Sequence, residues 1–248
     1  MRFNVLTLFP EIPAAFFESS IMAKAVERGL ITYNLVNIRA FAYDKHRTCD
    51  DLTYGGGAGM LLLPQPLALA LDSVQAAEKR VIYVTPSGKP FTQSCAEELA
   101  REEELVFICG RYEGIDQRII DEYVDDEISL GDYVMSSGEL AALVVIDAVY
   151  RLIDGVISRE SLEEESFSDG LLEYPQYTRP QIFRDRVVPE VLLSGHHEHI
   201  RKWRLEQRIR KTLAMRPDLL SAIRSSDKWT KEAELILQEI TNGREFNS

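Results

Sequence analysis

The chain has 248 residues, of which 45% are hydrophobic and 27% charged, and its formal net charge is −12. This length fits one large α/β domain or one domain with a smaller appendage. No run approaches the roughly 18 apolar residues of a membrane span, and three scattered cysteines argue against a disulfide framework or a zinc ribbon. The acidic charge, taken alone, argues against a nucleic-acid partner. We expect a reduced, soluble protein of the cytoplasm.

The first segment of the chain predicts a parallel sheet. Residues 2–8 alternate in polarity and include β-branched types, so we expect a strand that ends at Phe9 and Pro10. Apolar residues at helical intervals predict a helix over 13–28, which Gly29 ends, and residues 31–38 predict a second strand. A strand, a helix and a strand in this order favour parallel pairing.

Residues 39–60 lack a regular apolar period and contain the run AYDKHRTCDDLTYGGGAGM. The glycines make this segment flexible unless something orders it, and a loop of this length in a compact domain is usually functional. Lys45, His46 and Arg47 give it a local positive charge. The alternative is a plain surface loop with a glycine hinge.

Three further elements are expected between residues 64 and 101. Pro64 and Pro66 begin a helix over 64–79. The apolar run at 81–85 predicts a strand, which the turn Pro86-Ser87-Gly88 ends, and a helix is expected over 91–101.

The most informative stretch is residues 105–139. An apolar run at 105–109 predicts a buried strand that ends at Gly110, and residues 115–123 predict a short helix. A second glycine-bounded loop at 131–139 precedes an apolar helix over 140–153, which fits either the interior or a subunit interface. Strand ends of this kind hold ligands in open α/β sheets, although ordinary turns would also explain each glycine. Since neither a dinucleotide fingerprint nor a phosphate loop occurs here, we expect a ligand that is not held by its phosphates.

The last part of the chain differs in charge from the rest. Residues 157–180 are polar, acidic and interrupted by Gly170, Pro175 and Pro180, which predicts a linker. Residues 175–248 carry 14 Lys and Arg against 10 Asp and Glu, a net charge of +4 that leaves −16 for residues 1–174. Helices are expected over 200–215, with Arg and Lys on its outer faces, and over 228–240. The cluster at 196–199 has neither a cysteine partner nor H-E-x-x-H spacing, so we expect no metal site.

Two motifs carry a family resemblance. GRYEGID at 110–116 and SLGDYVMSSGEL at 129–140 resemble the S-adenosylmethionine-binding loops of the bacterial tRNA (guanine-N1)-methyltransferases, of the SPOUT class of trefoil-knotted methyltransferases. The resemblance extends from LFPE at 8–11 to SGHHEHIRKWR at 194–204. It implies an α/β fold in which a parallel-sheet domain, residues 1–157, ends in a deep trefoil knot. It also implies a linker over 158–174 that carries the catalytic carboxylate, a small helical tRNA-binding domain over 175–248, and a homodimer with a shared active site.

The resemblance implies S-adenosylmethionine as the methyl donor, held by three segments of the first domain. In the family, the turn after the strand at 81–85 forms a third wall beside the two glycine loops. The residues that the resemblance assigns to donor binding are Tyr83, Val84, Pro86, Gly110, Tyr112, Glu113, Ser129, Leu130, Gly131, Asp132, Tyr133, Val134, Met135, Ser137 and Gly138.

The expected chemistry requires a base, because N1 of guanine carries a proton and is a poor nucleophile until the proton is removed. The family has its catalytic carboxylate in the pattern Asp-Ser-Phe, whereas this chain has Glu165-Ser166-Phe167. Glu165 is therefore the expected base, with Asp169 in reserve. Arg151 occupies the position of the family's essential arginine and is expected to stabilise negative charge on guanine O6. Without the family, the linker would be interpreted as solvated and Arg151 as a helix-terminal arginine.

The function implied is transfer of a methyl group to N1 of the guanosine at position 37, immediately 3′ of the tRNA anticodon. Mg²⁺ is compatible with this chemistry, but no residue pattern requires it. Two other functions fit: a non-catalytic RNA-binding or ribosome-associated module of the same fold, and a knotted methyltransferase that acts on ribose or on rRNA. The residues expected to contact the anticodon branch of tRNA are Lys45, His46, Asp50, Gly55, Gly56, Gly57, Gly59, Met60, Glu173, His197 and Arg201.

Overall fold

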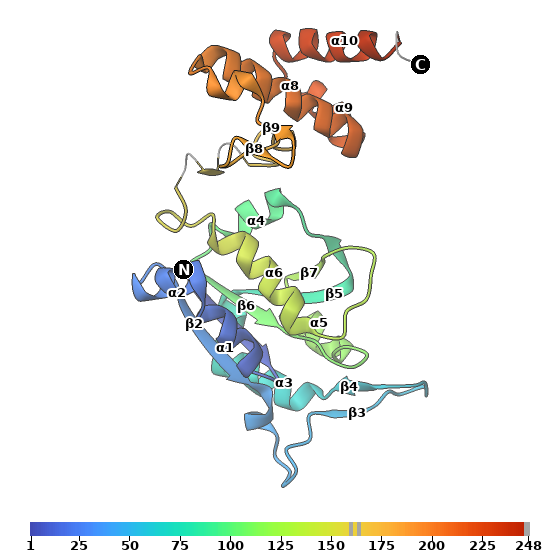
Figure 1. The fold of residues 1–248 in the computed structure, drawn as a ribbon. Coiled ribbons are helices and arrows are strands. Elements are labelled where there is room, and N and C mark those ends of the chain that lie inside the picture. Colours follow the sequence, from blue (N-terminus) through green and yellow to red (C-terminus); the bar gives the residue numbers. More distant parts are fainter. Residues whose placement is uncertain (159–160, 163–164, 246–248) are drawn as a thin grey trace. The chain divides into compact units, whose positions relative to one another are not determined.

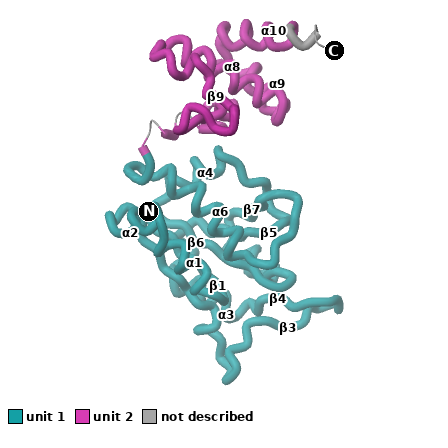
Figure 2. Tube along the Cα trace, in the orientation of Figure 1, with its two compact units in different colours: residues 1–157 teal, residues 158–248 magenta. Residues whose placement is uncertain are grey.

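The computed structural model of the chain describes residues 1–158, 161–162 and 165–245. The chain divides into two compact units, Met1–Ile157 and Ser158–Ser248 (Figure 2). Each unit has a hydrophobic core of its own. Within the described ranges, none of the helices combines the length and the apolar character that crossing a membrane would need.

The first unit is built on a five-stranded sheet in which all neighbouring strands run parallel (Figure 1). The strand order is β2-β1-β6-β5-β7, so β6 lies at the centre of the sheet and β7 at one edge. The parallel sheet predicted from the sequence is thereby confirmed. The strands are β1 (Arg2–Thr7), β2 (Thr32–Asn37), β5 (Arg80–Pro90), β6 (Glu104–Ile108) and β7 (Asp126–Ser129).

Helices cover both faces of this sheet, because its central strands are apolar on both sides. On one face, Phe3 and Phe107 pack against α1, α2, α4 and α6, and on the other, Val106 and Ile108 pack against α3 and α5. The residues of β6 from 105 to 108 are fully buried, as their unbroken apolar run predicts. The helices are α1 (Glu11–Phe17), α2 (Ser20–Glu27), α3 (Pro64–Ser73), α4 (Gln93–Leu99), α5 (Gln117–Tyr123) and α6 (Gly138–Tyr150), with short 3-10 helices η1 (Ile38–Phe41) and η2 (Ala76–Glu78).

Two predicted helices are interrupted by single residues with a left-handed backbone. The helix expected over 13–28 is two helices, α1 and α2, and α2 begins at Ser20, whose φ is 55°. The helix expected over 64–79 ends after α3, because Gln75 has a φ of 54° and starts the separate turn η2. Neither residue is a glycine, so the local sequence does not announce these breaks.

Two predicted segments have more strand structure than expected. The strand expected over 81–85 continues to Pro90, with a shift in its pairing to β7 between Val84 and Lys89. Gly88 lies against β7 at this irregularity, since a Cβ on it would be 2.5 Å from the backbone carbon of Glu127. The loop expected over 39–60 contains an antiparallel hairpin formed by β3 (Asp50–Leu52) and β4 (Met60–Leu62).

The second unit consists of a short hairpin followed by helices. The helices pack around Ile209, Leu220 and Ile236, and Leu171 joins the same core. The helices predicted over 200–215 and 228–240 are present, with their starts and ends shifted by a few residues, and α9 was not predicted. The elements are β8 (Ile182–Phe183), β9 (Arg186–Val187), η3 (Glu190–Leu193), α8 (His197–Met215), α9 (Pro217–Arg224) and α10 (Lys231–Glu245).

Candidate active site

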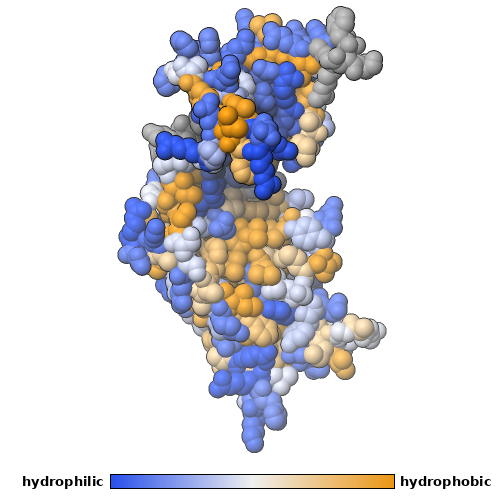
Figure 3. Space-filling model, viewed as in Figure 1, coloured by the Kyte–Doolittle hydropathy of each residue, from blue (hydrophilic) through white to orange (hydrophobic). Residues whose placement is uncertain are grey.

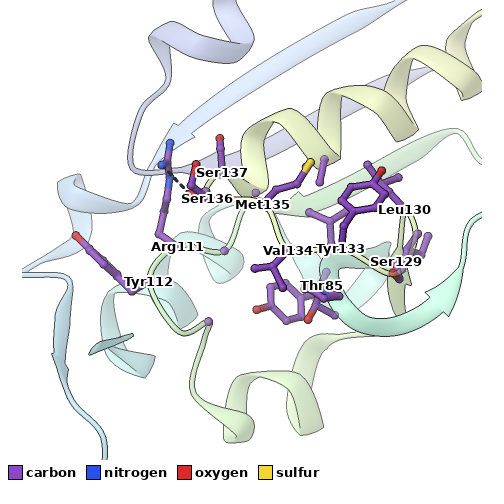
Figure 4. Close-up of a pocket in the computed structure, with 18 of the residues that line it drawn as sticks. Thr85, Arg111, Tyr112, Ser129, Leu130, Tyr133, Val134, Met135, Ser136 and Ser137 are labelled. Atoms are coloured by element: carbon purple, nitrogen blue, oxygen red, sulfur yellow. Dashed lines mark hydrogen bonds between the residues drawn. The ribbon is translucent and has the colours of Figure 1, made fainter. Parts of the chain in front are cut away.

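A cavity of about 270 Å³ lies at the carboxyl ends of β6 and β7, beside residues 83–86 in the middle of β5 (Figure 4). Ligands of open parallel sheets bind at such strand ends. The volume is close to the lower end of the roughly 300–1,000 Å³ that is typical of small-molecule sites. The wall is formed by residues from 83–86, 110–114 and 128–138, with Ala141 of α6.

Most of the residues expected to hold the methyl donor line this cavity. Gly131 and Asp132 do not, although their loop neighbours do. The expected residues in the wall are Tyr83, Val84, Pro86, Gly110, Tyr112, Glu113, Ser129, Leu130, Tyr133, Val134, Met135, Ser137 and Gly138. The wall also contains Thr85, Arg111, Gly114, Ile128, Ser136 and Ala141, which sequence reasoning left out although most of them lie within or beside the motifs.

Tyr83 packs closely against two glycines of the wall. Its side chain is buried, and a Cβ on Gly110 or on Gly114 would lie 3.0 Å from its ring or its hydroxyl. Gly114 also has a φ of +121°, which residues with side chains rarely adopt. Burial raises the pKa of Tyr83, so the hydroxyl stays neutral. Tyr83 therefore offers the cavity an uncharged aromatic ring.

The loop after β7 folds back on itself. The Gly131 amide donates to Ser129 Oγ at 3.2 Å, and the Tyr133 amide donates to the Gly131 carbonyl at 2.8 Å. A Cβ on Gly131 would lie 2.8 Å from the Tyr133 ring, so glycine allows the tyrosine to pack there. The side chains that follow, Val134 and Met135, are exposed. This loop gives the cavity a mostly apolar outer wall.

The loop after β7 contacts the loop after β6 at Gly138, where α6 begins. The Gly138 amide donates to the Gly110 carbonyl at 3.2 Å. A Cβ on Gly138 would lie 2.5 Å from the Gly110 nitrogen, and backbone atoms cannot move aside as the end of a flexible side chain can. Glycine is therefore required for α6 to begin this close to the end of β6.

Glu139, the next residue, is fully buried and connects three segments of the fold. Its carboxylate accepts from Thr7 Oγ1 at 2.6 Å and from Ser137 Oγ at 2.9 Å. Arg111 Nη2 lies 2.9 Å from Oε2 of the same carboxylate. These contacts join the end of β1 to the loop after β6 and the start of α6, and the last two segments line the cavity.

Two further contacts hold the Arg111 side chain. Its Nη1 donates to the Ser136 carbonyl at 3.1 Å, and Figure 4 shows this bond as a dashed line. Its guanidinium carbon lies 4.5 Å from the centre of the Phe9 ring, a favourable cation–π distance. Sequence reasoning missed this network. The only sign of the network in the sequence is one acidic residue in the first turn of an apolar helix. The helix dipole alone also favours an acidic residue there, so this sign is ambiguous.

The β3–β4 hairpin brings two of the expected tRNA-contacting residues to the cavity. The Glu113 amide donates to the Met60 carbonyl at 3.0 Å, and the Leu62 amide donates to the Gly114 carbonyl at 3.0 Å. Gly59 has a φ of +103°, which favours glycine, and a Cβ on it would lie 2.4 Å from Cγ of Glu113. Gly59 and Met60 therefore lie beside Glu113, which lines the cavity.

The other expected tRNA contacts of the first unit lie in the same segment. Asp44 accepts from the His46 amide at 2.9 Å in an exposed turn that also contains Lys45. The turn of the β3–β4 hairpin contains Gly55, Gly56 and Gly57, all exposed and all with a positive φ between +80° and +125°. Asp50, the first residue of β3, is half-buried.

The structure places the two candidate bases, Glu165 and Asp169, in the second unit and Arg151 in the first. Glu165 is half-buried. Arg208 donates to both carboxylate oxygens of Asp169. Although burial acts in the opposite direction, the Arg208 contact lowers the pKa of Asp169 below its usual value. A carboxylate held in its ionised form is a weak base, which argues against Asp169 as the base.

The remaining residues expected to contact tRNA lie in the second unit, and two of them form ion pairs there. Arg201 Nη1 is 2.8 Å from Oε2 of Glu232. Glu173 is 4.0 Å from Lys211, and His197 is exposed at the start of α8. Among the described residues, no group of three or more His, Cys, Asp or Glu side chains is arranged to hold a metal ion.

Comparison with known proteins assigns the chain to a family. The family model described as tRNA (Guanine-1)-methyltransferase TrmD matches residues 1–222. A tRNA (guanine-N(1)-)-methyltransferase of Treponema denticola is 76% identical over 98% of this chain and 100% of its own length. Those of Treponema pallidum and Borrelia duttonii are 65% and 60% identical, over 97% and 88% of this chain and 96% and 92% of their own lengths. The chain therefore belongs to the tRNA (guanine-N1)-methyltransferase family and is an enzyme of that class.

Proposed function

We propose that the enzyme transfers the methyl group of S-adenosylmethionine to N1 of the guanosine at position 37, directly 3′ of the tRNA anticodon. The observation that carries this proposal is the cavity beside β5 and at the carboxyl ends of β6 and β7, whose wall contains both glycine loops. A sulfonium methyl donor is already activated. The protein therefore has to hold the donor and to prepare the acceptor nitrogen.

The wall of the cavity suits a nucleoside with an aliphatic sulfur-containing tail. Tyr83, Leu130 and Met135 supply apolar surface, and Gly110 and Gly114 add no side chains that would fill the cavity. Apolar walls with a few placed polar groups are typical of small-molecule sites. The sequence has no phosphate loop at this position, which fits a ligand without phosphates.

In the proposed reaction, Glu165 removes the proton from guanine N1, and Arg151 stabilises the negative charge that builds on O6. The electron pair freed on N1 forms the new bond to the methyl carbon as the carbon–sulfur bond breaks. The ion pair with Arg208 lowers the pKa of Asp169 and so argues against Asp169 as the base.

We also propose that the first unit contains the trefoil knot of the SPOUT class and binds the donor, and that residues 158–174 link it to a tRNA-binding domain over 175–248. The position of α6 supports the knot. After β6 the chain passes through α5 and β7, and then returns to place the start of α6 against the Gly110 backbone. A chain that returns to its own earlier loop in this way is what a knot of this class requires.

The proposed enzyme is a homodimer in which each active site uses residues of both protomers. Its support lies on α6, which is buried except for one face. On that face Leu140 and Val144, one helical turn apart, are 53% and 51% exposed. Apolar side chains gather over α6 in the space-filling view (Figure 3). A contiguous exposed apolar patch of this kind is typical of a protein–protein interface.

The test is incubation of the enzyme with labelled donor and an unmodified tRNA transcript, followed by nucleoside analysis. We expect 1-methylguanosine at position 37, and no methylation of a transcript with adenosine at that position. A methyl group on ribose, or methylation of rRNA but not of tRNA, would refute the proposal. Glu165→Gln should bind S-adenosylmethionine normally in calorimetry but lose turnover. The control, Asp169→Asn, should retain turnover.

A further inference from the structure

We infer that the β8–β9 hairpin of the second unit is an RNA-binding surface, an assignment that rests on the proposed tRNA substrate. The hairpin consists of β8, β9 and the two-residue turn Arg184-Asp185 (Figure 1). It forms a two-stranded sheet of its own and pairs with no other described strand. All residues from 176 to 187 are exposed. The core of the unit therefore does not require the apolar and basic side chains of the hairpin.

The hairpin exposes large apolar side chains beside an arginine. Ile182 and Phe183 are each 60% exposed, and Val187 is 55% exposed. The guanidinium of Arg184 lies 5.3 Å from the centre of the Phe183 ring. Unpaired RNA bases stack on aromatic rings and on arginine planes, and an exposed ring next to a guanidinium offers both.

The hairpin arginines carry charge that no described carboxylate neutralises. Neither Arg184 nor Arg186 forms an ion pair within the described part of the chain, whereas most arginines of α8 and α9 do. A paired arginine must give up a carboxylate before it binds a phosphate, so an unpaired one contributes more to RNA affinity. The pairs in the helices are Arg201–Glu232, Arg208–Asp169, Arg210–Glu206, Arg216–Asp218 and Arg224–Glu234.

The two residues of the hairpin turn are not those that its backbone conformation prefers. Arg184 and Asp185 have φ values of 48° and 65°, the left-handed pair of a type I′ turn, for which Asn-Gly is preferred. Residues with larger side chains are strained in this conformation, and such strain gathers where a side chain has a function. Arg184 and Arg186, which have no described carboxylate partner, are complementary to a polyanion such as RNA.

The test compares tRNA binding by a hairpin variant and by a matched control. The hairpin variant combines Arg184→Ala and Arg186→Ala. The control combines Arg210→Ala and Arg216→Ala, which remove two exposed, ion-paired arginines of the same unit and change the net charge equally. With an unmodified tRNA transcript, the hairpin variant should bind about 10-fold more weakly and lower the slope of log K against log salt by about 1.4, at about 0.7 per phosphate contact. The control should stay within about 2-fold of the wild type.

A second pair of variants tests stacking. Phe183→Ala should weaken tRNA binding about 5-fold or more, and Phe183→Tyr, which keeps the ring, should restore it. Wild-type enzyme that fails to methylate tRNA would refute the proposed function. An active wild type whose hairpin variants bind tRNA as tightly as the control would refute the hairpin inference alone. Loss of the dimer in sedimentation, with unchanged tRNA affinity, would assign the hairpin to a contact between protomers and overturn its RNA role.

Discussion

The buried Glu139 carboxylate is expected to be the most sensitive single group around the cavity. Glu139→Gln keeps the shape of the side chain and removes its charge. The amide oxygen of the variant can accept from Ser137 and Arg111. The amide nitrogen can donate to Thr7 Oγ1, which has two lone pairs and already accepts from the Phe9 amide at 2.9 Å. The hydrogen bonds are therefore largely kept, and the substitution isolates the loss of the counter-ion of Arg111.

The size of the effect follows from burial. Removing one partner of a buried ion pair costs about 3–5 kcal/mol. The Arg111 side chain is 20% exposed and keeps the Ser136 carbonyl and the Phe9 ring, so we expect the lower end, about 3 kcal/mol, for Glu139→Gln. Glu139→Ala also removes the acceptor of two hydroxyls and leaves a space, which raises the expected cost to about 5 kcal/mol.

Urea unfolding followed by circular dichroism measures these differences in the free energy of unfolding. Wild type and variants have to be compared at one protein concentration, because the stability of the proposed dimer would depend on it. Glu97→Gln, which alters an exposed carboxylate on α4, is the matched control and should change stability by less than about 0.5 kcal/mol. A Glu139→Gln variant as stable as this control would refute the reasoning, since Arg111 would then need no buried counter-ion.

Other substitutions test the contact between the loops, the ion pair near the linker and the exposed face of α6. Gly138→Ala should cost about 3 kcal/mol or more in thermal unfolding, because its Cβ would meet backbone atoms, whereas Gly195→Ala, with nothing within 4 Å, should cost about 1 kcal/mol from its positive φ. The Asp169–Arg208 pair stabilises the second unit above the unfolded pKa of about 3.9, and this contribution is lost as the pH falls through the lower folded pKa. Asp169→Asn should therefore flatten the acid-unfolding curve, and an unchanged curve would contradict the pairing. Val144→Glu should give monomers in sedimentation and abolish methylation, and a dimeric, active variant would rule out the α6 interface.

How far the sequence predicts this fold depends on whether the signal of an element is local. The strand β6 was predictable because its apolar run is unbroken and its burial follows directly. The strand β7 was not expected, since it begins with Asp126 and Glu127 and is a strand because β5 pairs with it at the edge of the sheet. The continuation of β5 past Pro86 has the same cause. Its residues are turn formers locally, and the pairing partner that extends them lies about forty positions further along the chain.

The same distinction between local and distant signals applies to the candidate site. The glycine loops were found because their residues are contiguous and form recognisable motifs. The Glu139 network was not, because Thr7 and Glu139 are 132 positions apart and Arg111 comes from a third segment. An acidic residue in the first turn of a helix usually complements the helix dipole at the surface. Only the close approach of α6 to the end of β6 makes this one a buried anchor.

For α8, the amino-acid composition and the structure lead to different conclusions about the charge that is available to bind RNA. Its arginines predict a basic face for RNA, yet Arg201 is bound by Glu232, 31 positions away, and Arg208 by Asp169, 39 positions away. Exchanging such a carboxylate for a phosphate replaces one ionic contact with another, and exposed contacts of this kind contribute little. Affinity for a polyanion therefore depends on the cations that the fold leaves without a carboxylate. By that criterion Arg184 and Arg186, two residues of a short hairpin, matter more than the longer basic run that follows them.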